Sequence, residues 1–121
     1  MQPLKLNLVQ QSLMSEEKKS EIEVRQTRVF KKAYKRLSEN LQDQVDDEID
    51  KIIDDPDIGT RKKSDLSHMW VHKFKLDNAE VLLGYSWNES ALLITLMNVG
   101  SHENFYQEAK NRRKADLKAI K

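Results

Sequence analysis

A predicted strand gives way to a predicted helix within the ten residues Met97-Asn98-Val99-Gly100-Ser101-His102-Glu103-Asn104-Phe105-Tyr106. An apolar and partly β-branched run from Leu92 to Thr95 precedes them and predicts a buried strand. Gly100 breaks that strand and a polar helix start follows, so we expect His102 at the margin of a sheet. An imidazole titrates near neutral pH, and a rigid element can present it to a ligand. His102 is therefore a candidate functional residue; the alternative is that it only caps the following helix.

The size and composition of the chain limit what it can be. Its 121 residues suffice for one core, and 38% hydrophobic against 34% charged residues fits a small two-layer fold with a polar extension. No apolar run is long enough to span a bilayer, and the first residues do not have the pattern of a signal peptide. The chain has no cysteine, which excludes disulfides and thiolate metal sites. We expect a bacterial-type cytoplasmic protein without membrane contact.

The net charge of +1 conceals a segregation of charge along the chain. Residues 28–37 hold five basic side chains and no acid, whereas residues 39–57 hold nine acids and a single lysine. The last twelve residues hold six basic side chains and a single acid. A basic face can contact a polyanion, or the two oppositely charged stretches can form neighbouring helices that attract each other. The sequence leaves both interpretations open.

The first half of the chain predicts one strand and two helices after an N-terminal extension. Residues 1–20 are expected to form a flexible arm or a short helix. The alternation over residues 21–26 predicts a half-buried strand, and Thr27 is placed to cap a helix that ends near Leu37. A second amphipathic helix follows and ends before Pro56. The short junction between the helices predicts that they are antiparallel neighbours.

The second half predicts a meander and a terminal helix. Strands are expected at residues 69–75, 80–87 and 91–99, with turns short enough to require antiparallel pairing. Apolar residues beyond Ser101 predict a last helix. The expected fold is α+β in the order β-α-α-β-β-β plus a C-terminal helix, a single domain over residues 21–121. The helices are expected on one face of a twisted antiparallel sheet.

Four short motifs in this order resemble a known family. They are Arg61-Lys62-Lys63-Ser64-Asp65-Leu66, Val71-His72-Lys73-Phe74-Lys75, Leu82-Leu83-Gly84-Tyr85 and Gly100-Ser101-His102-Glu103-Asn104-Phe105-Tyr106. Between Ile22 and Arg113 the chain resembles the RelE/ParE toxins of bacterial type II toxin–antitoxin modules, and most of all the mRNA-cleaving branch with a C-terminal Gly-Ser-His motif. The resemblance implies a toxin neutralised by a cognate antitoxin, with operator DNA bound only through that antitoxin. Its branches imply either ribosome-dependent cleavage of mRNA or poisoning of DNA gyrase; a non-catalytic binding module is a further alternative.

Cleavage in the first branch implies transesterification within the RNA. A base takes the proton of a ribose 2′-hydroxyl, the oxygen attacks the adjacent phosphate, and an acid protonates the leaving 5′-oxygen. Because the substrate supplies its own nucleophile and cationic side chains can offset the phosphorane charge, no metal or other cofactor is required. The parts needed are a titratable group, cations and a surface on which bases stack.

The resemblance assigns these parts to particular residues. His102 is the expected acid/base, Lys73 is expected to stabilise phosphate charge, and Tyr106 is expected to stack on a base or orient the phosphate. Further RNA contacts are expected from Lys62, Lys63, Lys75, His72, Arg112 and Arg113. Lys73 and Lys75 have a plainer interpretation as solvent-facing strand residues.

Other residues have structural interpretations, and two positions depart from the family pattern. Trp70, Trp87 and Tyr85 are expected mainly in the core. His68 and His72 are four residues apart, a spacing that joins two metal ligands on a helix but not on a strand, so we expect no metal site. Family members commonly carry arginines where this chain has Leu82 or Leu83 and Asn98. Asn98 cannot neutralise a phosphorane, so Lys73, Arg112 or Arg113 would have to substitute.

Overall fold

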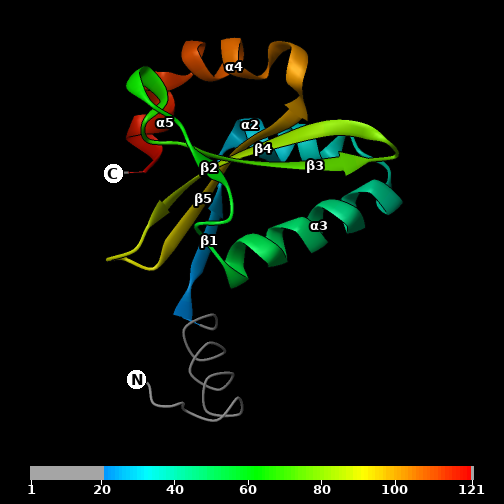
Figure 1. The fold of residues 1–121 in the computed structure, drawn as a ribbon, viewed down its shortest axis with the longest axis horizontal. Helices are drawn as coiled ribbons and strands as arrows, with labels where there is room; N and C mark the ends of the chain where they lie inside the picture. The colour runs from blue at the N-terminus through cyan, green and yellow to red at the C-terminus, as the bar shows by residue number, and fades with distance from the viewer. Residues whose placement is uncertain (1–20, 121) are drawn as a thin grey trace.

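The computed structural model describes residues 21–120, which form a five-stranded sheet with helices on both faces (Figure 1). The predicted extension over residues 1–20 lies outside the described residues. The elements are β1 (Glu23–Gln26), α2 (Arg28–Lys35), α3 (Glu39–Asp54), β2 (Thr60–Arg61), the 3-10 helix η1 (Ser64–Leu66), β3 (Trp70–Leu76), β4 (Ala79–Asn88), β5 (Leu93–Ser101), α4 (His102–Asn111) and α5 (Arg113–Ala119). The predicted α+β class and element order are confirmed, with β2 as a short additional strand.

The sheet is mixed, in the strand order β1-β5-β4-β3-β2. The meander of β3, β4 and β5 is antiparallel as predicted. The expectation of a wholly antiparallel sheet is wrong at β1, which lies parallel to β5 with Val24 opposite Ile94. A parallel pair requires a long connection, and α2, α3 and the meander provide it. β1 is also more exposed than the predicted half-buried strand, because it is a terminal strand of the sheet.

Side-chain caps define where the first two helices begin. The Thr27 hydroxyl accepts a hydrogen bond from the Phe30 amide at the start of α2, as predicted. The same hydroxyl donates to the Met97 carbonyl at 2.8 Å, which ties the helix start to β5. Ser38 accepts from the Leu41 amide and caps α3. Each cap satisfies an amide that the helix itself leaves unpaired.

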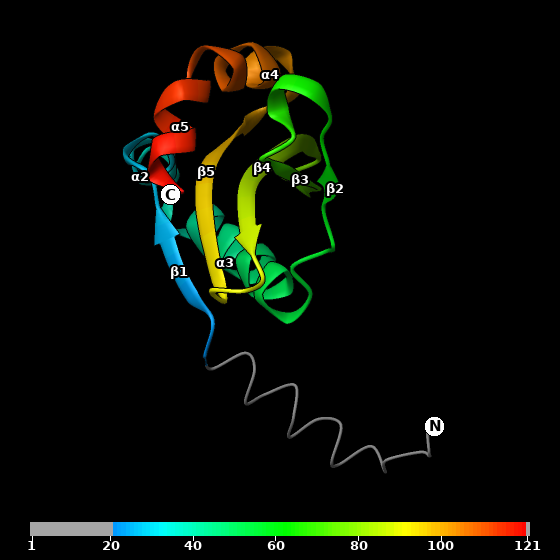
Figure 2. The same ribbon diagram turned by 90° about the vertical axis from the view of Figure 1, so that its left-hand side faces the viewer.

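The two faces of the sheet are covered by different helices (Figure 2). Adjacent strand residues point to opposite faces, and accordingly Leu83 packs in a cluster with residues of α2 and α3 while Leu82 packs in a cluster with α4. The expectation of helices on one face only is therefore wrong. The physical reason is that β4 and β5 are apolar on both faces, so α4 must cover the second one.

The C-terminal region contains two helices where a single one was expected. α4 ends at Asn111, and Arg112 has φ −94° and ψ 0° before α5 begins. Arg113 also donates from Nε to the Asp65 carbonyl at 2.9 Å, which fixes the start of α5 against η1. Within residues 21–120, none of the helices has the length and apolarity that a membrane crossing requires.

Candidate functional site

A groove of about 430 Å³ brings together several of the residues singled out from the sequence. We call it the β3–α4 groove; it is lined by Ile58, Thr60, Lys62, Val71, His72, Lys73 and Tyr106. Lys73 pairs across the sheet with Leu82, which packs against α4, so the two side chains share that face. The groove thus lies beside α4, at the part of β3 that extends beyond its short pairing with β2.

Tyr106 is the aromatic centre of this site. Its half-buried ring packs edge-to-face on His102 with ring centroids 5.7 Å apart, and on Phe105 with centroids 5.4 Å apart. Helix geometry explains the first contact, because residues four apart lie on one face of α4. His102 is the first residue of α4 and is exposed, while Ser101 occupies the capping position. His102 therefore does not cap the helix, and its ring is open to a ligand.

Two lysines line the groove with Tyr106. The Lys62 ammonium lies 5.0 Å from the centroid of the Tyr106 ring, a cation–π contact. Lys73 is exposed on β3 and lines the same groove. The Lys62 amide donates to the Met69 carbonyl at 2.9 Å, so the backbone that carries this lysine is attached to the chain entering β3. The result is a half-buried aromatic ring flanked by cations and an imidazole.

Tyr85 fixes the loop that forms the outer wall of the groove. Its hydroxyl donates to the Pro56 carbonyl at 2.7 Å and accepts from the Gly59 amide at 3.0 Å. The prediction that Tyr85 packs in the core is confirmed, since it has no exposed surface. Burial raises the pKa of Tyr85 to about 12, so the hydroxyl stays protonated and keeps both bonds. Tyr85 is thus a positioning residue for Ile58 and Thr60, neither of which was singled out from the sequence.

His72 borders the groove, but its side chain is hydrogen-bonded to Glu48 of α3. It is buried, and its Nε2–H donates to the Glu48 carboxylate at 2.7 Å. Burial raises the pKa of Glu48, but the hydrogen bonds from Lys51 and His72 outweigh it, so the net pKa is lowered. This carboxylate therefore stays charged and holds the imidazole. An RNA contact from His72 would have to use its remaining surface.

The other predicted RNA-contacting residues lie outside the groove lining. Lys75 is exposed on the same face as Lys73, opposite Glu80. Lys63 is exposed at the start of η1. Arg112 and Arg113 follow the far end of α4, about 15 Å along the helix from His102 at 1.5 Å per residue. The structure therefore brings Lys62, Lys73, Tyr106 and His102 together and does not bring the two arginines to them.

Asn98 stands at a position where the family resemblance implies an arginine, and its side chain is hydrogen-bonded to other residues of the chain. Asn98 donates from Nδ2 to Glu108 on α4 at 3.3 Å and accepts from the Val99 amide. Near it, a Cβ placed on Gly100 would meet no atom of the described chain within 4 Å. Gly100 is the cross-strand neighbour of Leu82, which is itself the neighbour of Lys73. This row of the sheet therefore has free space at its Gly100 end.

The remaining aromatic and imidazole side chains are accounted for by packing. Trp70 and Trp87 are half-buried against the α2–α3 cluster, in agreement with the expected core role, and Trp70 stacks on Tyr85. Burial, and to a smaller extent the charge of Arg113, lower the pKa of His68. His68 and His72 thus have different surroundings and do not form a pair.

A comparison with protein-family models gives the class of this protein. Residues 24–110 match the model described as ParE-like toxin of type II bacterial toxin–antitoxin system. The chain belongs to this family, and the resemblance to RelE/ParE toxins is confirmed. None of the curated proteins compared with the chain matches it significantly in sequence.

Solved structures with the same fold include E. coli RelE in several states. A double arginine-to-alanine mutant of RelE in the free state has 20% identity and a TM-score of 0.58, covering 74% of this chain and 94% of that chain. The intact E. coli RelBE toxin–antitoxin complex gives 18% identity and 0.54, covering 66% and 95%. The same mutant with an antitoxin RelBc peptide gives 19% and 0.55, covering 74% and 94%. At these identities the likeness concerns the fold.

Proposed function

We propose that this toxin is a metal-independent endoribonuclease that cleaves mRNA on the ribosome and is neutralised by a cognate antitoxin. The observation that carries the proposal is the cluster around Tyr106, whose ring contacts both His102 and Lys62. Tyr106, Lys62 and Lys73 line the β3–α4 groove, and His102 is next to it through its contact with Tyr106. A titratable group, cations and a stacking surface are the three parts that cleavage through the 2′-hydroxyl requires.

The chemistry assigns one role to each part. His102 exchanges protons with the reacting oxygens as acid/base, and its exposure lets a strand of RNA approach the ring. The 2′-oxygen attacks phosphorus, the bond to the 5′-oxygen breaks, and that oxygen takes up a proton. The products are a 2′,3′-cyclic phosphate and a 5′-hydroxyl. Lys73 and Lys62 offset the negative charge that accumulates on the phosphorane oxygens.

Tyr106 is the residue on which a nucleobase stacks. Base–aromatic stacking contributes about 1–3 kcal/mol per base and requires a ring whose orientation is fixed. Contacts with His102, Phe105 and Lys62 hold the ring of Tyr106 in place. A stacked base would leave the adjoining phosphate close to the imidazole and the lysines.

Mapping of mRNA ends in a purified translation system tests the proposal. The wild-type protein is expected to produce new 3′ ends that carry a cyclic phosphate, and only when ribosomes occupy the message. Adding EDTA at a concentration that leaves ribosomes intact should not reduce cleavage of ribosome-bound message. Intact mRNA in the presence of active, correctly folded toxin would overturn the nuclease assignment.

A second candidate function is poisoning of DNA gyrase. It is favoured by the ParE-like description of the matching family model and by Asn98, which stands where the family resemblance implies an arginine and is bonded to Glu108. A gyrase supercoiling assay separates the two functions, because only a gyrase poison traps cleaved plasmid DNA. Trapped DNA together with intact mRNA would favour this second function. If expression of the protein leaves growth unaffected, and neither mRNA cleavage nor trapped DNA is found, the protein is a non-catalytic binding module.

A further inference from the structure

A pocket of about 310 Å³ forms where the end of α5 meets the β4–β5 hairpin and the residues after η1. We call it the α5 pocket; it is lined by Arg61, His68, Ser86, Trp87, Asn88, Glu89, Ser90, Leu93, Thr95 and Ile120. It shares no lining residue with the β3–α4 groove. Helix α5 follows residues 24–110, which match the family model, so the pocket is partly built from sequence outside that match.

The α5 pocket contains buried polar atoms that have no partner. Among residues 21–120, three buried side-chain atoms lack a hydrogen bond, namely His68 Nε2, Thr95 Oγ1 and Asp116 Oδ1. His68 and Thr95 line the pocket, and Asp116 lies on the face of α5 that carries Ile120 one turn later. A buried polar group without a partner destabilises the fold, because it has lost its hydration. The pocket therefore has room for a partner that the chain itself does not supply.

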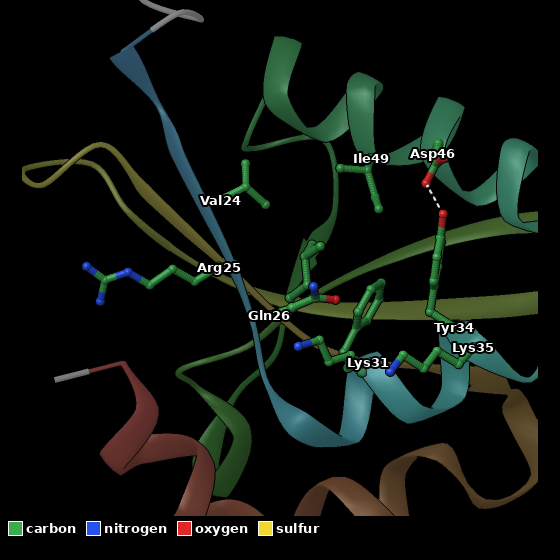
Figure 3. Close-up of a pocket in the computed structure, with 10 residues that line it drawn as sticks. Val24, Arg25, Gln26, Lys31, Tyr34, Lys35, Asp46 and Ile49 are labelled. Carbon is green, nitrogen blue, oxygen red and sulfur yellow. Dashed lines mark hydrogen bonds between the residues drawn. The ribbon is translucent and has the colours of Figure 1, made fainter.

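The hollow between β1 and α2 provides a contrast (Figure 3). There the Tyr34 hydroxyl donates to Asp46 at 2.8 Å, and among the described residues that line this hollow none has an unpartnered buried polar atom. Its floor includes the core residues Phe30 and Leu96. That hollow needs no ligand to complete its hydrogen bonds, whereas the α5 pocket does.

The floor of the α5 pocket offers hydrogen bonds without a net charge. Ser86 and Thr95 are directly opposite each other on β4 and β5, and both are buried. Because burial and the charge of Arg113 lower the pKa of His68, its imidazole is neutral at pH 7 and has one donor and one acceptor nitrogen. Rotation of Thr95 about its Cα–Cβ bond and a flip of the imidazole ring can turn the unpartnered atoms to the pocket. Such a floor matches the edge of a nucleobase, which carries uncharged donors and acceptors side by side.

The mouth of the pocket carries two charges of opposite sign. Arg61 and Glu89 are exposed, and neither has an ion-pair partner among residues 21–120. Arg61 Nε donates to the Ser67 carbonyl at 3.1 Å, and the guanidinium lies 5.9 Å from the centroid of the Trp70 ring. These contacts hold the guanidinium and leave its two terminal nitrogens for a ligand. A guanidinium binds phosphate through paired hydrogen bonds, and a carboxylate accepts hydrogen bonds from ribose hydroxyls.

We propose that the α5 pocket binds a single nucleotide, with its base on the uncharged floor and its ribose and phosphate at the charged mouth. The base exchanges hydrogen bonds with Thr95, Ser86 and His68. Arg61 binds the phosphate, and Glu89 accepts hydrogen bonds from the ribose hydroxyls.

The size and walls of the pocket agree with a ligand of this kind. Leu93 and Ile120 supply apolar surface for the faces of the base. A volume of about 310 Å³ is at the small end of ligand pockets, which favours one nucleotide over a longer stretch of a strand. A free mononucleotide and a nucleotide unit of RNA share this chemistry. The inference does not depend on the proposed nuclease activity, because the two sites have no residue in common.

Titration of the full chain with mononucleotides tests the proposal. The probes are the 5′-monophosphates of adenosine, guanosine, cytidine and uridine, the corresponding nucleosides, and inorganic phosphate; calorimetry gives each affinity. We expect one mononucleotide to bind more tightly than the others, because the floor reads the edge of the base. Its nucleoside should bind about tenfold more weakly, since the charged hydrogen bonds to Arg61 are lost. Amide shifts of the isotope-labelled protein should include Ser86 and Thr95.

A short single-stranded RNA oligonucleotide distinguishes the two sources of the nucleotide. If the pocket takes a unit of RNA, the oligonucleotide should shift the Thr95 amide signal and compete there with the mononucleotide. If the pocket takes free mononucleotides, the mononucleotide should shift Thr95 and the oligonucleotide should not. Both results support the site and differ in the source that they assign.

Matched variants separate a ligand contact from a structural role. Thr95→Val should weaken nucleotide binding about fivefold, yet leave the unfolding temperature unchanged or raise it, because it removes an unpartnered buried hydroxyl. A purely structural hydroxyl would give a lower unfolding temperature instead. Arg61→Gln should abolish the preference for the nucleotide over the nucleoside. Arg36→Gln changes the charge equally at an exposed position outside the pocket and should bind as the wild type does.

Four results would overturn the proposal. The first is that the folded protein binds neither a mononucleotide nor the oligonucleotide. The second is that inorganic phosphate binds as tightly as the nucleotide, and the third is that Thr95→Val and Arg61→Gln both bind as the wild type does. The fourth is that every nucleotide probe shifts Lys62, Lys73 and Tyr106 and leaves Thr95 unchanged, which would place the ligand in the β3–α4 groove.

Discussion

The ammonium nitrogen of Lys62 lies 5.0 Å from the centroid of the Tyr106 ring, although the two residues belong to a loop and a helix far apart in the sequence. This contact joins the wall that follows β2 to the face of α4 that also carries His102. The proposed nuclease depends on it, because it sets the stacking ring next to a cation. The predictions below begin with this cluster.

Replacing His102 by Ala should lower mRNA cleavage about 10²–10⁴-fold, the usual contribution of a general acid/base. The side chain is exposed, so the free energy of unfolding should change by no more than about 0.5 kcal/mol. Cleavage rates are compared with those of Gln107→Ala, an exposed position on the same helix. Wild-type cleavage by the His102 variant would refute the assigned role.

Replacing Tyr106 by Phe or by Ala separates the ring from its hydroxyl. Phe keeps the contacts with His102, Phe105 and Lys62, so RNA affinity should stay close to that of the wild type. Ala removes the stacking surface and should weaken RNA binding by about 1–3 kcal/mol. If Phe is as defective as Ala, the hydroxyl and not the stacked ring is the important group.

The two lysines of the groove and the two arginines beyond α4 should differ in their effect on RNA binding. Lys62→Ala and Lys73→Ala should each reduce the dependence of the logarithm of affinity on the logarithm of salt concentration by about one unit. Arg112→Ala should change it less, because that side chain is not part of the groove. Salt titrations of RNA affinity measure this, and an equal effect from all three would extend the binding surface along α4.

The Glu48–His72 pair should make stability depend on acid pH. The folded-state pKa of Glu48 is lowered below its ordinary value of 4.5, so its stabilisation is complete above about pH 4.5 and is lost as pH falls through the folded-state pKa. Glu48→Ala should cost about 1.5–3 kcal/mol at pH 7, since a hydrogen bond to a charged group is lost. Urea unfolding from pH 7 to pH 3 should show this difference shrinking. A difference that does not vary with pH would argue against a charged Glu48 carboxylate in this hydrogen bond.

Two glycines should respond oppositely to replacement by alanine. A Cβ on Gly84 would lie 2.8 Å from Met69 Sδ and 2.9 Å from Phe105, so Gly84→Ala should destabilise the fold by about 1–3 kcal/mol. Gly100 has open space and no positive φ, so Gly100→Ala should leave stability unchanged or slightly raised. Thermal unfolding of both variants provides the measurement. Comparable destabilisation would mean that the space at Gly100 is filled in solution.

Local pattern was sufficient for the first two helices and the meander. Thr27 caps α2 as its residue type and position predicted, and the short turns after β3 and β4 fixed antiparallel neighbours. Pattern did not indicate that β1 pairs with β5, because strand pairing across some seventy residues leaves no local signal. It also missed Ile58 and Thr60, whose positions depend on the hydroxyl of Tyr85.

By itself the sequence determined most of the elements, the family and the residue types that a nuclease site requires, because hydrophobic periodicity and short motifs are local properties of the chain. Only the tertiary structure decided which of those residues meet. It gathered Lys62, Lys73 and Tyr106 in one groove, engaged His72 with Glu48, and left Arg112 at the far end of α4. The physical reason is that the apolar faces of the sheet dictate where α3 and α4 pack, and the polar side chains are carried to the positions that this packing leaves open.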